Sequence, residues 1–206
     1  MKSMSLTPKK GKGKGTHLPE KTQMAQNVEI KAQLIDSTVQ RELACNLADT
    51  SPTTQVQEDV FFQVPGGRLK LRQLSDGSGQ LIFYDRPDQP GPKTSKYGIY
   101  PTDNPSCLKK LLKGAFGIRA VVRKTREILM IGRTRLHLDQ VEGLGEFLEL
   151  EVVLEEGEDP EVGRKEAQRL MTLLKITPES LVAEAYVDLL TQSTKAGCQT
   201  PVNQGT

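Results

Sequence analysis

The sequence TRLHLDQVEGLGEFLELE, residues 134–151, sets the pattern from which the fold can be inferred. On either side of a glycine-containing turn, charged or polar side chains alternate with leucines. Successive side chains of a β-strand point to opposite faces, so this stretch predicts a strand at 134–141 and another at 146–155. One face of each strand is then apolar, and the other carries Arg135, His137, Asp139, Glu149 and Glu151. The EGLGE segment is interpreted as a turn, because a strand rather than a helix follows it.

The same alternation recurs upstream in three more segments. Each carries two charged residues at positions i and i+2, and in the first two the opposite face is apolar, with Val28 and Ile30, and Leu69 and Leu71. The pairs are Glu29 with Lys31, Lys70 with Arg72, and Lys124 with Arg126. A sheet with one face in water would explain any one strand. Five strands with this pattern favour a closed barrel, with the charged faces inside and the apolar faces outside under helices. Buried charges are costly unless they are paired, so such an interior must be wide, wet and suited to a charged ligand.

The remaining segments predict an α+β domain of about eight strands and four helices. The strands are expected at 27–34, 54–64, 68–74, 80–86, 95–100, 117–131, 134–141 and 146–155. Helices are expected to start at Asp36 or Ser37, at Asp103, at Asp159 and at Pro178, the third ending near Lys175 and the last at Leu190. Tyr97 and Tyr100 are interpreted as strand-packing residues, His137 as a lumen-lining residue bonded to its neighbours, and Asp188 as part of a helix end.

Composition limits the domain organisation and the classes of partner. The 206 residues carry a net charge of only +2, which argues against a dedicated nucleic-acid binder. Residues 1–24 are Lys- and Gly-rich and 192–206 are polar, so both are predicted to be disordered tails around a domain at 25–191.

No apolar run is long enough for a membrane helix. Three scattered cysteines favour a reducing compartment, and we expect a cytoplasmic protein. The KKGKGK run would also suit nuclear import, but a solvated tail is the favoured interpretation.

The charges of the predicted lumen indicate a ligand. The acidic side chains are hard oxygen donors suited to Mg²⁺ or Mn²⁺, and the basic ones suit several phosphate groups. The acids are Glu29, Asp139, Glu149 and Glu151, and the bases are Lys31, Lys70, Arg72, Lys124, Arg126 and Arg135. A polyphosphate bridged by a divalent metal would satisfy both sets.

Seven segments together resemble the CYTH family of triphosphate tunnel metalloenzymes, which includes class IV adenylyl cyclases and thiamine triphosphatases. They are NVEIKA (27–32), GRLKLRQ (67–73), GQLIFYDRPD (79–88), GPKTSKYGIYP (91–101), VVRKTRE (121–127), TRLHLDQVEGLGEFLELE (134–151) and AYVDLL (185–190). The spelling is closest to the cyclase-like branch. The resemblance implies a closed or nearly closed eight-stranded antiparallel β tunnel with flanking helices.

The resemblance also implies roles for individual residues. The family's ExExK element falls on Asn27, Glu29 and Lys31, so its first acid is here a neutral amide and a poorer metal ligand. Glu29 and Lys31 are the implied catalytic pair, and Glu29, Asp139, Glu149 and Glu151 are the implied metal ligands. The implied substrate-binding residues are Lys31, Lys70, Arg72, Arg86, Lys124, Arg126 and Arg135. Lys124 could exchange roles with Arg123 if a bulge shifts the strand by one residue.

The expected function is metal-dependent turnover of a triphosphate. The substrate would be ATP, thiamine triphosphate or inorganic triphosphate, and the sequence leaves open cyclisation of ATP to cyclic AMP and pyrophosphate or hydrolysis. A tunnel that binds polyphosphate or nucleotide without turnover is the alternative, motivated by Asn27. Polyanion binding through the basic tail is the least supported interpretation. No nucleic-acid or membrane partner is expected, and a homodimer stays open.

Overall fold

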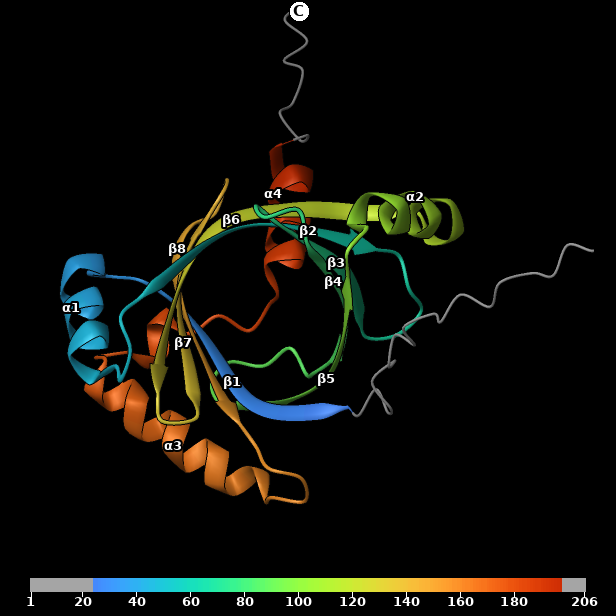
Figure 1. The fold of residues 1–206 in the computed structure, drawn as a ribbon. Helices are drawn as coiled ribbons and strands as arrows, with labels where there is room; N and C mark the ends of the chain where they lie inside the picture. The colour runs from blue at the N-terminus through green and yellow to red at the C-terminus, as the bar shows by residue number, and fades with distance from the viewer. Residues whose placement is uncertain (1–23, 198–206) are drawn as a thin grey trace, which may run out of the picture.

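The computed structural model describes residues 24–197 of the chain. The predicted N-terminal tail, except Met24, lies outside these residues, as does the end of the chain from Cys198. Figure 1 shows a barrel seen along its axis, with helices around the rim and across one side.

In this described part of the chain, eight strands close into a barrel, as the sequence predicts. Their order around the wall is β1-β5-β4-β3-β2-β6-β7-β8, and every neighbouring pair is antiparallel. The strands are β1 (Ala25–Gln33), β2 (Thr53–Phe62), β3 (Arg68–Leu74), β4 (Gly79–Asp85), β5 (Lys93–Thr102), β6 (Ile118–Ile131), β7 (Thr134–Val141) and β8 (Gly145–Val153). Closure pairs the first strand with the last, so that Glu29 lies opposite Glu151 and Lys31 opposite Glu149.

Three of the predicted helices form near their expected starts. They are α1 (Ser37–Leu47), α2 (Pro105–Phe116) and α3 (Pro160–Leu173). Asp36 and Asp159 cap α1 and α3 through their carboxylates. The cap of α2 is Asn104 rather than the expected Asp103, because the Asn104 side chain accepts the bond from the backbone N–H of Cys107. No helix in residues 24–197 has the length and apolar character needed to cross a lipid bilayer.

The last helix differs from the prediction. Pro178–Ser180 forms only one 3₁₀ turn, and α4 runs from Tyr186 to Gly197, into the segment assigned to the C-terminal tail. The intervening residues are extended because they pair with β1. Leu181 bridges Ala32, and the N–H of Val182 donates to the carbonyl of Lys31 at 2.9 Å.

The two faces of the wall have opposite character. The outer face packs Ile30, Leu136, Leu148 and Leu150 against the helices, and all four are essentially inaccessible to solvent. Ala167, Leu170 and Leu174 of the α3 region cover this apolar face (Figure 1). Burial of the outer face therefore fixes the strand register and turns the charged residues inward.

One end of the barrel is closed by the segment that leads into α4. Tyr186 at the start of α4 packs edge-on against Phe147 of β8, with ring centroids 5.0 Å apart. Ala185 and Val187 belong to the same apolar cluster as these rings. Asp188 ties α4 to the barrel, because its carboxylate accepts hydrogen bonds from Arg68 and Arg119. The structure thus confirms that Asp188 belongs to a helix end.

Candidate active site

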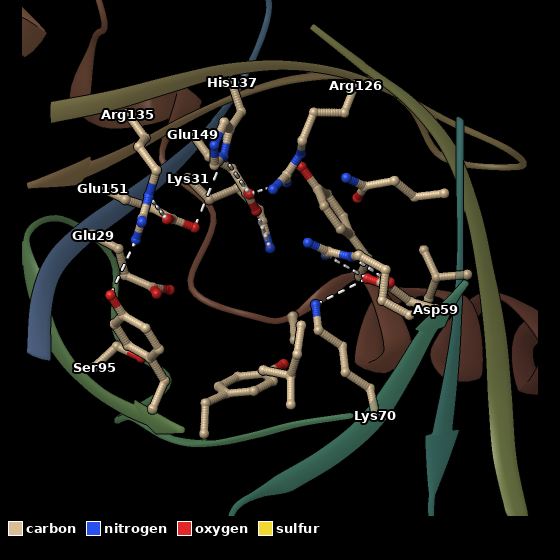
Figure 2. A pocket seen from close by; sticks show the side chains of 18 of the residues that line it. Glu29, Lys31, Asp59, Lys70, Ser95, Arg126, Arg135, His137, Glu149 and Glu151 are labelled. Atoms are coloured by element: carbon tan, nitrogen blue, oxygen red, sulfur yellow. Dashed lines mark hydrogen bonds and ion pairs between the residues drawn. The ribbon is translucent and has the colours of Figure 1, made fainter. Parts of the chain in front are cut away.

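The barrel encloses a cavity of about 320 Å³, and the alternate residues of all eight strands line it. In the described part of the chain, seven basic side chains and four carboxylates reach this cavity. They are Lys31, Lys70, Arg72, Arg86, Lys124, Arg126 and Arg135, and Glu29, Asp59, Glu149 and Glu151. The structure therefore brings together every basic residue predicted for the site. Figure 2 shows the glutamates gathered across the cavity from Asp59 and Lys70.

Asp59 of β2 organises the cationic wall, and the sequence analysis did not identify it. Its carboxylate accepts two hydrogen bonds from Arg72, at 2.8 and 2.9 Å, and one from Lys70 at 2.9 Å. Lys124 lies 4.0 Å from the same carboxylate. Only 2% of Asp59 is exposed. Although burial raises the pKa of Asp59, the charges of Arg72 and Lys70 outweigh it and hold the pKa well below the usual range. Three of the cations predicted to bind phosphate are therefore held around one buried anion.

Lys124 and Arg126 of β6 point into the barrel, and Arg123 points out. The Lys124 side chain is 2% exposed, whereas that of Arg123 is 58% exposed. The exchange of roles between Arg123 and Lys124 that a bulge would cause does not occur. The only register shift between β2 and β6 lies at Phe61/Phe62, too far along the strand to change the facing of Lys124.

Asp139 was predicted to be a metal ligand, but it does not belong to the cluster formed by His137, Glu149 and Glu151. Both of its oxygens accept from the guanidinium of Arg126, at 2.6 and 2.5 Å. Tyr186 donates to it at 3.0 Å, and Lys124 lies 3.4 Å away. Asp139 lies opposite Phe147, two residues before Glu149 on β8, and is 2% exposed. It therefore orients Arg126 and Lys124 from the inward face of β7.

Glu149 and Glu151 meet His137 on the opposite wall. Ligand atoms of these three side chains lie within 4.8 Å of one another. His137 Nδ1 is 3.8 Å from an oxygen of each glutamate and has no hydrogen-bond partner among residues 24–197. His137 thus lines the lumen beside the two glutamates, as expected, but its Nδ1 lies beyond ordinary hydrogen-bond distance from both. Burial, followed by the charge of Arg126, lowers the pKa of His137 and favours the neutral ring that a metal requires.

This donor set fits a divalent cation. Two carboxylates and a neutral imidazole converge from β7 and β8, and Glu29 of β1 lies in register with Glu151. Such oxygen-rich sites suit Mg²⁺ or Mn²⁺. Burial, with Glu151 and Glu149 adding to it, raises the pKa of Glu29 despite the ion pair that joins it to Arg86 at 2.8 Å. An added positive charge in this cluster would relieve the repulsion among the carboxylates.

Lys31, Arg86 and Arg135 each pair with one of the cavity glutamates. Lys31 Nζ lies 3.3 Å from Glu149 and 3.8 Å from the centre of the Tyr186 ring, and it donates to the carbonyl of Glu184 at 3.1 Å. Arg86 donates to the carbonyl of Ala183 at 3.0 Å. Arg135 pairs with Glu151 at 2.8 Å. Tyr186 was hidden from the sequence analysis because the last helix was predicted to start eight residues earlier, at Pro178.

We expect the affinity for inorganic triphosphate to fall as the pH rises through about 7 because of Lys70. Burial, followed by the charge of Arg72, lowers the pKa of Lys70 to about 7 in the absence of ligand. The protonated amine attracts the anion, so the deprotonation above this pH weakens binding. Lys70→Arg keeps the charge at all these pH values, and its affinity should fall less over the same range. Titration calorimetry of both proteins at pH 6 to 9 would show this, and parallel curves would contradict it.

Comparison with known proteins identifies the family. The model of the CYTH domain matches residues 25–186, and the chain belongs to this family. An adenylate cyclase, CyaB of Aeromonas hydrophila, is 25% identical over 179 residues, which cover 81% of this chain and 89% of that protein. The solved PH1012 protein of Pyrococcus horikoshii has a TM-score of 0.71 at 23% identity, covering 79% of this chain and 98% of that one. A Hippeastrum protein, described as an adenylyl cyclase candidate with a dominant triphosphatase activity, has a TM-score of 0.57 at 16% identity. That match covers 87% of this chain and all of the other.

Proposed function

We propose that this protein is a divalent-metal-dependent enzyme that acts on a triphosphate by nucleophilic attack at phosphorus. The observation that carries the proposal is the arrangement of two complementary walls around one cavity. The cationic wall centred on Asp59 faces the cluster of His137, Glu149 and Glu151. Cations alone would suit any polyanion, and carboxylates alone would suit any hard metal. The pair of walls suits a triphosphate that arrives with a metal ion.

The cationic wall holds the phosphates. Asp59 already orients Lys70 and Arg72, and Lys124 lies between Asp59 and Asp139. Asp139 and Glu149 hold Arg126. Because these side chains are held before the substrate arrives, little ordering remains to oppose binding. Guanidinium groups additionally offer paired N–H donors that match the oxygens of a phosphate.

Glu149, Glu151 and His137 would hold the metal. When bound, Mg²⁺ or Mn²⁺ supplies positive charge that offsets the charge developing on the phosphate oxygens of the transition state. Arg126 and Lys31 both contact Glu149. Glu149 therefore fixes the position of the proposed metal ligands relative to two of the proposed phosphate-binding cations.

In this proposal Glu29 accepts the proton of the nucleophile, and Lys31 orients the nucleophile or the phosphate. The raised pKa of Glu29 suits a carboxylate that accepts a proton as the attacking oxygen bonds to phosphorus and the bridging P–O bond breaks. Attack by water at a phosphorus gives hydrolysis and leaves the proton on Glu29. Attack by the ribose 3′-hydroxyl of ATP on the α-phosphorus gives cyclic AMP and pyrophosphate. Lys31, held by Glu149 and the Glu184 carbonyl, orients the attacking oxygen or the phosphate beside it.

Both reactions have support among the relatives. The Aeromonas relative bears the name of an adenylate cyclase, and the Hippeastrum protein is described by its triphosphatase activity. Because the two reactions use the same cavity walls and differ in the nucleophile, one panel of substrates separates them.

We expect ATP, thiamine triphosphate or inorganic triphosphate to be turned over only with Mg²⁺ or Mn²⁺. Each substrate is incubated with each metal and with EDTA, and phosphate, pyrophosphate and cyclic AMP are quantified. Cyclic AMP with equimolar pyrophosphate identifies the cyclase, and phosphate without cyclic AMP identifies the hydrolase. Binding of a triphosphate without any turnover would instead favour the binding module that Asn27 motivates.

A further inference from the structure

Residues 182–184, which lead into α4, turn three consecutive backbone carbonyls toward basic side chains of the barrel. Each carbonyl accepts a hydrogen bond from a different side chain. The pairs are Val182 with Lys93 at 3.5 Å, Ala183 with Arg86 at 3.0 Å and Glu184 with Lys31 at 3.1 Å. Arg86 and Lys31 also line the cavity, where both are expected to contact the substrate. The position of residues 182–184 therefore limits where these two cations can lie.

The ammonium of Lys31 depends strongly on this part of the chain. Its contacts are the carbonyl of Glu184, the carboxylate of Glu149 at 3.3 Å and the Tyr186 ring, whose centre is 3.8 Å away. An ammonium has three N–H donors, so these contacts account for its capacity. Two of the three come from residues at the start of α4. A shift of this helix end would leave Lys31 held by Glu149 alone.

Asp188 fixes the start of α4. It is the third residue of this helix, and its carboxylate accepts a hydrogen bond from the N–H of Ala185 at 3.2 Å. In a capping box, the third residue of a helix reaches back in this way to the N–H that precedes the helix. The same carboxylate accepts from Arg68 of β3, at 2.8 Å, and from Arg119 of β6. One side chain, only 14% exposed, therefore sets where α4 begins and attaches it to two strands.

A chain of ion pairs gives Asp188 a second connection to Arg86. Arg68 donates to Asp88 as well as to Asp188, and Asp88 in turn accepts from Arg86 at 3.0 Å. The Asp88 side chain is 42% exposed, and exposed ion pairs contribute little. The backbone carbonyls of residues 182–184 are therefore the stronger link between Asp188 and the cavity.

Arg135 is a cavity cation without this link. Like Lys31, it lies beside a glutamate (Figure 2), and its partners are Glu151 at 2.8 Å and the hydroxyl of Tyr97 at 3.2 Å. Within residues 24–197, no hydrogen bond or ion pair joins Arg135 to the start of α4. Tyr97 lines the cavity here, which departs from its expected role in strand packing. Arg135 is therefore a suitable reference for the two cations that residues 182–184 hold.

We propose that Asp188 is a positioning residue for the reaction, which holds Lys31 and Arg86 in place through the carbonyls of residues 182–184. The inference rests on the proposed function and extends it to a residue outside the cavity lining. A misplacement of about 1 Å can slow an enzyme about a hundredfold. Asp188→Asn keeps the size of the side chain and removes the charge that Arg68 and Arg119 share.

Titration calorimetry with inorganic triphosphate in EDTA tests this role without depending on turnover. We expect Asp188→Asn and Lys31→Met each to weaken binding about tenfold, the usual value of one hydrogen bond to a charged group. Because Asp188 acts partly through Lys31, the double variant should lose clearly less than the product of the two single losses. The same shortfall is expected when Asp188→Asn is combined with Arg86→Lys.

Arg135→Gln supplies the reference cycle. Its loss of affinity and that of Asp188→Asn should multiply, because Arg135 has no contact with the start of α4. If the losses of Asp188→Asn and Lys31→Met multiplied in the same way, Asp188 would act on the fold as a whole and the proposal would be wrong. Unchanged binding by Asp188→Asn would equally overturn it. Failure of the unaltered protein to bind triphosphate would overturn the proposed function as well.

Glu158→Gln is the control for the loss of an ion pair. Glu158 accepts two hydrogen bonds from Arg133, both at 2.7 Å, and its side chain is 19% exposed, close to the value for Asp188. Turnover of the best substrate of the panel is measured for both variants. We expect kcat to fall about tenfold in Asp188→Asn and to stay unchanged in Glu158→Gln. Equal kcat values in the two variants would contradict the positioning role.

Discussion

The double variant Glu149→Gln with Glu151→Gln is expected to lose metal-dependent turnover by about a thousandfold. Glutamine keeps the size of each side chain and removes the negative charge on which a hard cation depends. His137 would then face two neutral amides. Turnover of the best substrate of the panel, measured over a range of Mg²⁺ and Mn²⁺ concentrations, gives the size of the loss.

The binding of triphosphate separates this effect from misfolding. Glu149 lies 2.5 Å from Arg126 and 3.3 Å from Lys31, so its neutralisation frees positive charge toward the cavity. We therefore expect the double variant to bind triphosphate in EDTA at least as tightly as the unaltered protein. A misfolded chain would lose binding together with turnover.

Glu146→Gln is the matched control. Glu146 lies on β8 but on the opposite face from Glu149, and it is exposed. Its substitution should leave turnover and metal dependence unchanged. If the double variant kept the activity of this control, the metal would have to bind elsewhere, and the mechanism proposed for the cavity would be wrong.

The sequence predicted the barrel well because the fold depends on alternation. In the segment 134–141, Leu136 and Leu138 alternate with charged or polar residues, and only one orientation of the strand buries both leucines. The same orientation turns the charged residues inward. Each basic residue found in this way lines the cavity, and Arg86, which came from the family resemblance, does too.

The sequence could not show which charges pair, because pairing depends on neighbours across strands. Asp139 shares a face with Arg135 and was grouped with the glutamates, yet the register of β6 with β7 places it opposite Arg126, and the start of α4 brings Tyr186 to it. Asp59 has Gln57 and Phe61 at the i−2 and i+2 positions, so it lacks the charged pair that drew attention to the other strands. A lone acid on the inward face of a β-rich segment was the available signal.

Tyr186 was missed for a different reason. A proline at 178 and the following apolar residues are compatible with a helix, but tertiary pairing with β1 outweighs this local preference. Leu181 and Val182 pair with β1, and the chain reaches the barrel interior again at Ala185 and Tyr186, where α4 begins. Local propensity could not have predicted a contact with a strand some 150 residues earlier.

Asp59→Asn is expected to destabilise the protein by about 3–5 kcal/mol, the usual cost of removing one partner of a buried ion pair. The substitution removes the negative charge that Lys70, Arg72 and Lys124 share on β2. Urea unfolding in EDTA would measure the free energy of unfolding. Glu58→Gln is the control, because Glu58 lies on the outer face of the same strand and pairs with Lys109 and Arg123 at the surface. Such exposed pairs contribute about 0–1 kcal/mol.

Inorganic triphosphate should restore much of the stability that Asp59→Asn removes. In the unaltered protein Asp59 neutralises the cations that a phosphate would otherwise contact, so the ligand competes with an internal anion. In the variant this competition is absent, and the ligand supplies the missing charge. Because the stabilisation by a ligand grows with the logarithm of its concentration divided by its Kd, the same excess of triphosphate should raise the unfolding free energy of Asp59→Asn by more than that of Glu58→Gln. An equal increase in the two variants would show that the anion binds away from Asp59 and its three cations.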